Sequence, residues 1–211
     1  GMENHGKYGQ FIYTHEDNSL YVNLFVASEL DWKDRRVVLR QETAFPYGET
    51  SRIVVAKGKG RFELKVRKPS WVAEGEFAVT VNGKPVSAKA GEDGYVAVDR
   101  KWKKGDVVEV AFPMHTSVVP LPNVPQYVAF MHGPIVLGMK TGTEDLRGII
   151  ADDSRFGQYA GGEYLPVDKA PMLLYGEADL ADCLKPVPGK PLHFTFEGIE
   201  VLNPIEGELQ P

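Results

Sequence analysis

The sequence is poor in cysteine, in excess positive charge and in long apolar runs. Cys183 is the only cysteine among the 211 residues, which excludes an internal disulfide and a zinc site built from several thiolates of this chain. The formal net charge of −5 gives no electrostatic reason to bind nucleic acid or an anionic membrane. No apolar run approaches the ~18 residues of a membrane span. We therefore set nucleic acid and membranes aside as partners.

Sequence motifs of catalysis are also missing. The five histidines stand at positions 5, 15, 115, 132 and 193, and none has the spacing of a metal-ligand pair. No nucleophile elbow, phosphate-cradling glycine loop or dinucleotide fingerprint occurs. The sequence accordingly predicts no catalytic residue, no metal ligand and no cofactor-binding residue in this chain.

Short alternating segments separated by turn residues fill the chain from residue 19 to about residue 140. In the clearest one, Arg61–Arg67, the side chains of Phe62, Leu64 and Val66 share one face, as in a strand with one wet side. Because some ten such segments occur with no long helix between them, we expect an antiparallel β-sandwich over residues 19–140. The other expected strands are residues 19–26, 36–43, 52–57, 77–81, 86–88, 94–99, 107–112, 127–131 and 135–139.

Asn82-Gly83 lies between two of these apolar segments. Both residue types accept positive φ, so this dipeptide indicates a tight hairpin turn.

The two ends of the chain have a different texture. Tyr8, Phe11 and Ile12 fall at offsets of three and four, which predicts a short helix whose apolar stripe needs tertiary contacts. After residue 141, prolines and glycines interrupt short apolar pieces, which indicates a loop-rich, partial second β domain over residues 141–211. The expected fold class is therefore all-β: an antiparallel β-sandwich with a short N-terminal helix and a loop-rich C-terminal β extension.

Two features suggest a ligand, each beside a structural alternative. Adjacent Asp152 and Asp153, next to Arg155, would cap a turn more readily than bind calcium or a sugar, because neighbouring side chains in extended chain point opposite ways. Tryptophans stack on sugars in many binding sites, but Trp71 and Trp102 flank amphipathic strands and are expected in the core. Trp32 is evenly balanced between the two roles. The candidate sugar or cation contacts are thus Trp32, Asp152 and Asp153.

A series of motifs, in order and spacing, resembles one family over nearly the whole chain. It is the β-L-arabinofuranosidase-like glycoside hydrolases of families 127 and 146, formerly a domain of unknown function. Residues 3–13 and 20–25 resemble the segment where those bacterial enzymes leave their helical barrel. The landmarks that follow resemble the family's first β-sandwich and the region after it, and are residues 68–71, 81–85, 102–106, 113–116, 133–137, 152–155 and 184–192.

The resemblance implies a retaining hydrolase with an (α/α)6 barrel, a cysteine nucleophile, a glutamate acid/base and zinc held by cysteines and a glutamate. The family's paired cysteines precede the segment that begins at Met2, so zinc is implied for the barrel and not for this chain. Cys183 lies far downstream and receives no catalytic role. Residues 1–18 are then expected to be a remnant of the last barrel helix.

Three functions follow as hypotheses. The first is a noncatalytic β-sandwich module of a plant-polysaccharide hydrolase, inactive without its barrel and, by the resemblance, periplasmic or extracellular. The second is an autonomous carbohydrate-binding module, which needs an exposed aromatic strip or polar groove. The third is an architectural or oligomerising domain. The expected partners are the upstream catalytic barrel, carbohydrate, and a second copy bound through uncovered apolar surface around Tyr8, Phe11 and Ile12.

Overall fold

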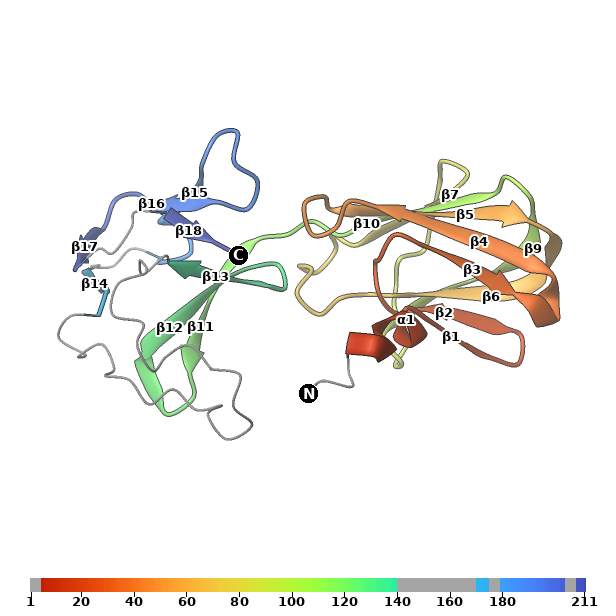
Figure 1. Cartoon of the computed structure of the whole chain (residues 1–211), viewed down its shortest axis with the longest axis horizontal. Coiled ribbons are helices and arrows are strands. Elements are labelled where there is room, and N and C mark those ends of the chain that lie inside the picture. Colours follow the sequence, from red (N-terminus) through yellow and green to blue (C-terminus); the bar gives the residue numbers. More distant parts are fainter. Residues whose placement is uncertain (1–4, 140–169, 175–178, 204–207) are drawn as a thin grey trace. The chain divides into compact units, whose positions relative to one another are not determined.

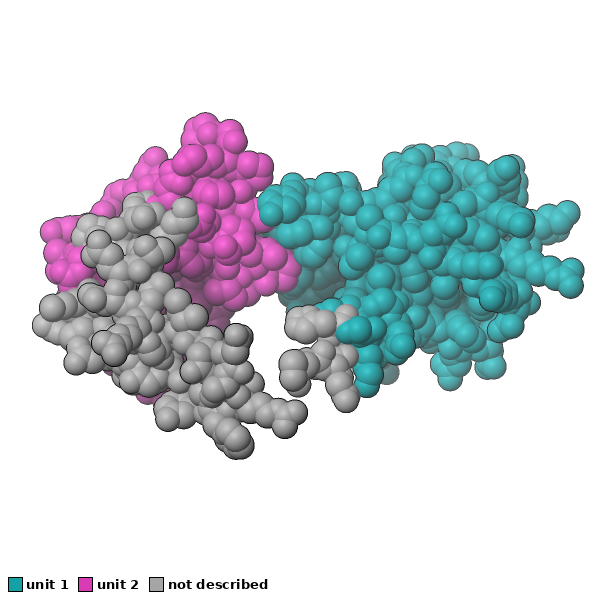
Figure 2. Space-filling view, in the orientation of Figure 1, with its two compact units in different colours: residues 1–115 teal, residues 116–211 magenta. Residues whose placement is uncertain are grey.

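A computed structural model describes residues 5–139, 170–174, 179–203 and 208–211 of the chain. The chain forms two compact units, unit 1 from Gly1 to His115 and unit 2 from Thr116 to Pro211 (Figure 2). Strands dominate both units, and the described residues contain one short α-helix. The predicted all-β class is therefore confirmed. Within the described residues, no helix is long and apolar enough to cross a membrane.

Unit 1 contains two sheets (Figure 1). The four-stranded sheet has the order β1-β2-β6-β9, with the strands β1 (Tyr13–Glu16), β2 (Ser19–Val22), β6 (Lys59–Arg67) and β9 (Tyr95–Lys103). The six-stranded sheet has the order β3-β4-β5-β10-β7-β8, with the strands β3 (Ser28–Trp32), β4 (Val37–Thr43), β5 (Thr50–Lys57), β10 (Val107–Ala111), β7 (Ala78–Val81) and β8 (Lys84–Val86). All pairs are antiparallel except β2 with β6, which is parallel. The 3-10 helices η1 (His5–Lys7) and η2 (Lys33–Arg35) complete the unit.

The core of unit 1 is built by alternation along the strands. Phe62, Leu64 and Val66 of β6 are buried as the sequence predicted, while the residues between them face solvent. Each such side chain removed from water contributes about 1.5–3 kcal/mol. The alternating pattern therefore decides which face of each strand points inward.

The predicted hairpin at Asn82-Gly83 is confirmed. Strands β7 and β8 pair with Val81 opposite Lys84, so the turn has two residues. Both have positive φ, 51° for Asn82 and 74° for Gly83, as a tight hairpin turn matching the strand twist requires.

The N-terminal helix is shorter than the sequence predicted. The α-helix α1 covers only Tyr8–Phe11, and Tyr13 already opens strand β1, which pairs with β2. Glycines at positions 6 and 9 weaken the helix, and pairing in the sheet satisfies the backbone of residues 13–16 better than a frayed helical turn would. Part of the segment expected to be a barrel-helix remnant is thus a strand of unit 1.

Unit 2 has one large and one small sheet among its described residues. The large sheet has the order β11-β12-β13-β18-β16-β15, with the strands β11 (Thr116–Leu121), β12 (Val124–His132), β13 (Ile135–Met139), β18 (Glu208–Gln210), β16 (Phe194–Phe196) and β15 (Leu184–Pro186). Strands β14 (Met172–Leu174) and β17 (Glu200–Leu202) form a separate pair.

The boundary between the units lies earlier than the sequence indicated. Strands β12 and β13 were expected in the first sandwich, but β13 pairs with β18, with Gly138 opposite Gln210. Alternation looks alike in every antiparallel strand, so the pattern identifies a strand without identifying its sheet. Long-range pairing decides that assignment.

Asp106 is a buried carboxylate that joins the turn between β9 and β10 to the turn between β7 and β8. It accepts hydrogen bonds from Asn82 Nδ2 (3.0 Å) and from the Lys103 backbone N–H (3.0 Å), with an Arg100 nitrogen at 3.8 Å. Burial acts to raise the pKa of Asp106, but these donors and the charges of Arg100 and Lys103 outweigh it and leave the pKa below its ordinary value. The ionised carboxylate therefore stabilises the fold.

Acidification is expected to remove this contribution. Because the folded-state pKa is depressed, the stabilisation is present above the unfolded value of about 3.9 and is lost as the pH falls through the folded pKa. At pH 7 the variant Asp106→Asn is expected to be less stable than the parent by about 1.5–3 kcal/mol. Urea titrations at pH 7 and pH 3 should show this gap narrowing in acid, and a gap that stayed constant would contradict the assignment.

Candidate functional site

The structure places all three tryptophans in the core of unit 1 or against it. Trp32 is only 5% exposed and meets Phe62 edge-on at 5.4 Å, with His15 and the Arg35 guanidinium over its other sides. It was a candidate sugar contact, and its burial leaves no ring face open for stacking. The physical reason is that Trp32 ends strand β3 on the inward side, where it fills space between the two sheets.

The other two tryptophans occupy the core positions that the sequence favoured. Trp102 is buried, stacks on Phe62 and donates its indole N–H to the Phe62 carbonyl oxygen at 2.9 Å. Trp71 is half-buried and stacks on Phe45 with ring centroids 6.2 Å apart. Unit 1 thus has no exposed tryptophan platform.

The other residues that the sequence analysis singled out form no catalytic or metal-binding site among the described residues. Asp152 and Asp153 lie outside the described residues. Cys183 is buried, and its thiol donates to the Asp179 carbonyl oxygen at 3.4 Å. Across the described ranges, no group of three His, Cys, Asp or Glu side chains is arranged to hold a metal ion.

The outer face of the four-stranded sheet carries a polar network. Lys65 donates to Asp93 at 2.9 Å and lies over the Tyr21 ring at 5.0 Å. The hydrogen bond with Asp93 raises the pKa of Lys65, and the bond with Lys65 lowers the pKa of Asp93. The Tyr21 and Tyr95 rings meet at 89°, so they do not form the coplanar strip that sugar stacking needs. These groups bind one another and act mainly as a solvated sheet face.

Exposed apolar side chains gather at the N-terminal segment of unit 1. Tyr8 and Phe11 of α1 are 55% and 54% exposed, and Val26 is 45% exposed. The segment after β2 is tied to the end of α1, because the Asn23 backbone N–H donates to the Ile12 carbonyl (2.9 Å) and Asn23 Nδ2 to the Phe11 carbonyl (3.1 Å). We call Tyr8, Phe11 and Val26 the α1 surface; Figure 1 shows α1 beside β1 and β2.

A buried glutamine fixes the segment that carries Val26. Gln41 Nε2 donates to the carbonyl oxygens of Leu24 (3.0 Å) and Val26 (2.8 Å), and Gln41 Oε1 accepts from Ser51 Oγ at 3.2 Å. Sequence reasoning missed this residue. Its signal was present, because Gln41 follows Val37 and Leu39 at inward-facing positions of one alternating strand. A polar residue at such a position needs internal partners.

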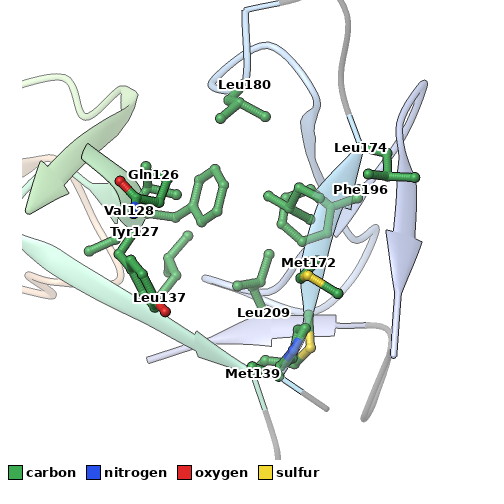
Figure 3. Close-up of a pocket in the computed structure, with 15 residues that line it drawn as sticks. Gln126, Tyr127, Val128, Leu137, Met139, Met172, Leu174, Leu180, Phe196 and Leu209 are labelled. Atoms are coloured by element: carbon green, nitrogen blue, oxygen red, sulfur yellow. The ribbon is translucent and has the colours of Figure 1, made fainter. Parts of the chain in front are cut away.

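Unit 2 contains an apolar cavity of about 600 Å³ (Figure 3). Its lining comes from β12, β13 and β14 and from Leu180, Phe196 and Leu209. Tyr127 is the one titratable side chain among the described residues that line the cavity, so these residues form no acid–base pair. It is suited to apolar contact and not to chemistry on a sugar.

By their fold, the two units are a pair of β-sheet domains, and their described residues form no recognisable catalytic site. Residues 19–114 match the family model of the middle domain of β-L-arabinofuranosidase, GH127, and residues 117–211 match that of a domain of unknown function, DUF4986. The first match covers nearly the whole of unit 1, which confirms the resemblance to family 127 that the sequence indicated. These matches support an accessory region of the glycoside hydrolase type.

Solved structures agree with this assignment. A GH127 β-arabinofuranosidase is 34% identical, with a TM-score of 0.53 over 60% of this chain and 23% of that chain. A GH127 β-L-arabinofuranosidase from Geobacillus stearothermophilus T6 is 33% identical, with a TM-score of 0.54 over 61% of this chain and 21% of that chain. The chain therefore spans about a fifth of the length of these relatives. No curated protein matches the chain.

Proposed function

We propose that this chain is a noncatalytic module of a retaining, β-L-arabinofuranosidase-like hydrolase of plant polysaccharide, inactive without an (α/α)6 barrel that it packs against. The observation that carries the proposal is the match of residues 19–114 to a middle domain. The similar solved enzymes are several times longer than this chain, which leaves room for a separate catalytic domain. By the same resemblance, we propose a periplasmic or extracellular location for the enzyme.

The nucleophile, the acid/base and the zinc belong to the barrel in this proposal. Cys183 is a poor candidate for the nucleophile because its thiol is buried and already donates to a backbone carbonyl. No zinc ligand set is formed by the described residues, so we derive no catalytic step for this chain. Its own contribution is a rigid sandwich that presents the α1 surface.

The α1 surface is the proposed contact with the barrel. Two aromatic rings that are more than half exposed to water are not stabilised by burial. A four-residue helix is marginally stable unless a partner covers its apolar side chains. Hydrogen bonds from the side chains of Asn23 and Gln41 hold this surface in place before any partner binds. In the absence of the barrel, the same surface is expected to mediate some self-association.

Measurements of hydrolytic activity test the proposed function. With an aryl β-L-arabinofuranoside as substrate, the chain alone is expected to show no turnover above background, whereas the chain joined to its upstream polypeptide turns over. In the longer protein, Phe11→Asp is expected to lower the melting temperature by several degrees through lost packing. The matched control is Tyr47→Asp, an exposed aromatic on the turn after β4, which should have little effect.

Two results would contradict the proposal. Turnover by the chain alone would place catalytic residues within it. Equal effects of Phe11→Asp and Tyr47→Asp would remove the α1 surface as the contact. A titration with arabinose-containing oligosaccharides tests the carbohydrate-binding alternative, which the buried tryptophans disfavour.

A further inference from the structure

Positive charge is concentrated in three short segments of unit 1. Residues 33–36, 57–61 and 100–104 hold ten of the 24 lysines and arginines of the chain and a single acidic residue, Asp34. These lysines and arginines are all exposed except Arg100, which is half-buried. The formal net charge of the whole chain is −5, so the total conceals a strongly basic region.

Long-range contacts bring these segments together. The carbonyl oxygen of Arg36 lies against Gly58, where a Cβ atom would be only 2.2 Å from it. The turn that follows β9 is bonded to β5, because the Gly105 backbone N–H donates to the Val55 carbonyl oxygen at 2.9 Å. The segments therefore meet at one end of unit 1. We call their lysines and arginines the basic end.

Elsewhere on the outer face of the four-stranded sheet, the charges are neutralised. Lys65 binds Asp93 at 2.9 Å, and Arg61 binds Asp99 at 2.7 Å. Glu63 lies between the two cations on the same strand, 3.9 Å from the Lys65 ammonium. This part of the face needs no further partner, because each of its cations has a carboxylate of the same unit.

At the start of β6, cations face one another instead. Lys59 lies directly opposite Lys103, and Arg61 lies directly opposite Lys101, in the register of β6 and β9. Like charges directly opposite one another in a sheet are destabilising. Across the described ranges, the ammonium groups of Lys59, Lys101 and Lys103 form no ion pair. A negatively charged partner would relieve this repulsion.

The side chains of the basic end favour one kind of negatively charged partner. None of the strongly exposed apolar side chains of the described residues lies in these segments. Protein interfaces are depleted of lysine and have an apolar centre, and sites for single-stranded nucleic acid carry aromatic platforms. An acidic polysaccharide needs neither feature, because its carboxylates are spread along a hydrated polymer and are attracted by clustered lysines and arginines.

We propose that the basic end of unit 1 binds an acidic polysaccharide through the carboxylates of its sugar residues. The choice of a polysaccharide rests on the proposed function, in which the enzyme acts on plant polysaccharide. Each contact is exposed to solvent and is screened within ~8 Å at physiological ionic strength. Binding therefore depends on several lysines and arginines acting together on one polymer, and it weakens as salt is added.

The test is isothermal titration calorimetry of the 211-residue chain with polygalacturonate. We expect binding at about 50 mM salt and a dissociation constant roughly tenfold or more higher at about 200 mM salt, as for other highly charged polymers. The methyl-esterified polymer has the same sugar backbone without the charge, and it should not bind.

A triple variant removes the unpaired lysines of the sheet face. Lys59→Ala, Lys101→Ala and Lys103→Ala together should raise the dissociation constant for polygalacturonate roughly tenfold or more at about 50 mM salt. The salt dependence should also become shallower, because fewer charges are neutralised on binding. A merely structural effect would not change that slope.

The matched control removes the same amount of charge from other exposed positions of unit 1. Arg67→Ala, Lys84→Ala and Lys89→Ala lie outside the basic end and should leave the affinity within about twofold of the parent, since long-range charge contributes little through screening salt. Unchanged circular dichroism of both triple variants checks that they fold. The comparison of the two polymers uses the unaltered chain and does not depend on any variant.

Four results would overturn the proposal. They are no binding of polygalacturonate at about 50 mM salt, equal binding of the methyl-esterified polymer, equal losses in the two triple variants, and equal affinity for poly-L-glutamate, which would show binding of any polycarboxylate. None of these measurements involves hydrolysis. A failure of the proposed function would be seen in the activity assay alone, so the two failures are distinguishable.

Discussion

Replacing Trp102 by alanine is expected to lower the free energy of unfolding of unit 1 by about 3–5 kcal/mol, the range for removal of a large aromatic from a packed core. Trp102 is among the largest fully buried side chains, stacks on Phe62 and closes a hydrogen bond to the Phe62 carbonyl. All three tryptophans, Trp32, Trp71 and Trp102, lie in unit 1, so urea unfolding followed by tryptophan fluorescence reports on that unit alone.

Two variants separate the contributions at this position. Trp102→Phe keeps an aromatic ring and loses the indole N–H, so its expected effect is smaller, about 1–3 kcal/mol, which is the range for one unsatisfied buried group. Lys101→Ala, the exposed neighbour on the same strand, should stay within about 0.5 kcal/mol. If Trp102→Ala behaved like Lys101→Ala, the core assignment of the ring would be wrong.

Replacing Gln41 by alanine is expected to lower the free energy of unfolding by about 3–4 kcal/mol, because it leaves a cavity and leaves buried polar groups without hydrogen-bond partners. The Leu24 carbonyl and the Ser51 hydroxyl lose the partner that the structure gives them, while the Val26 carbonyl keeps Ser28 Oγ at 2.7 Å. Urea titration measures the loss. Hydrogen exchange should also become faster at residues 23–27, the segment that Gln41 holds.

The matched control for Gln41→Ala is Arg40→Ala. Arg40 is the neighbour of Gln41 on the same strand, exposed and paired with Glu42 at 2.8 Å. Exposed pairs of this kind contribute between zero and about 1 kcal/mol. A similar loss of unfolding free energy in both variants, or unchanged hydrogen exchange at residues 23–27 in Gln41→Ala, would show that Gln41 does not hold the α1 surface in place.

Local pattern predicted much of unit 1. Alternation in Arg61–Arg67 placed Phe62, Leu64 and Val66 inside, and Asn82-Gly83 placed a two-residue turn. Strands β1 and β3 were missed. The first begins directly after the helix, and the second follows a segment whose loop geometry depends on Gln41, a contact distant in sequence.

The candidate surfaces were harder to predict than the strands. Tyr8 and Phe11 were recognised from their spacing, but Val26 joins them only because Asn23 binds the end of α1. Trp32 was balanced between core and ligand platform, since its burial follows from packing on Phe62, thirty positions along the chain.

By itself the sequence determined the all-β class, the hairpin and the inward side of the main strands, because these depend on periodicity and turn chemistry within a few residues. Only the tertiary structure decided where the units divide, which strands share a sheet and which apolar side chains remain exposed. Those outcomes depend on pairings between residues far apart in the chain, such as Gly138 with Gln210, and alternation is the same whichever partner a strand finds.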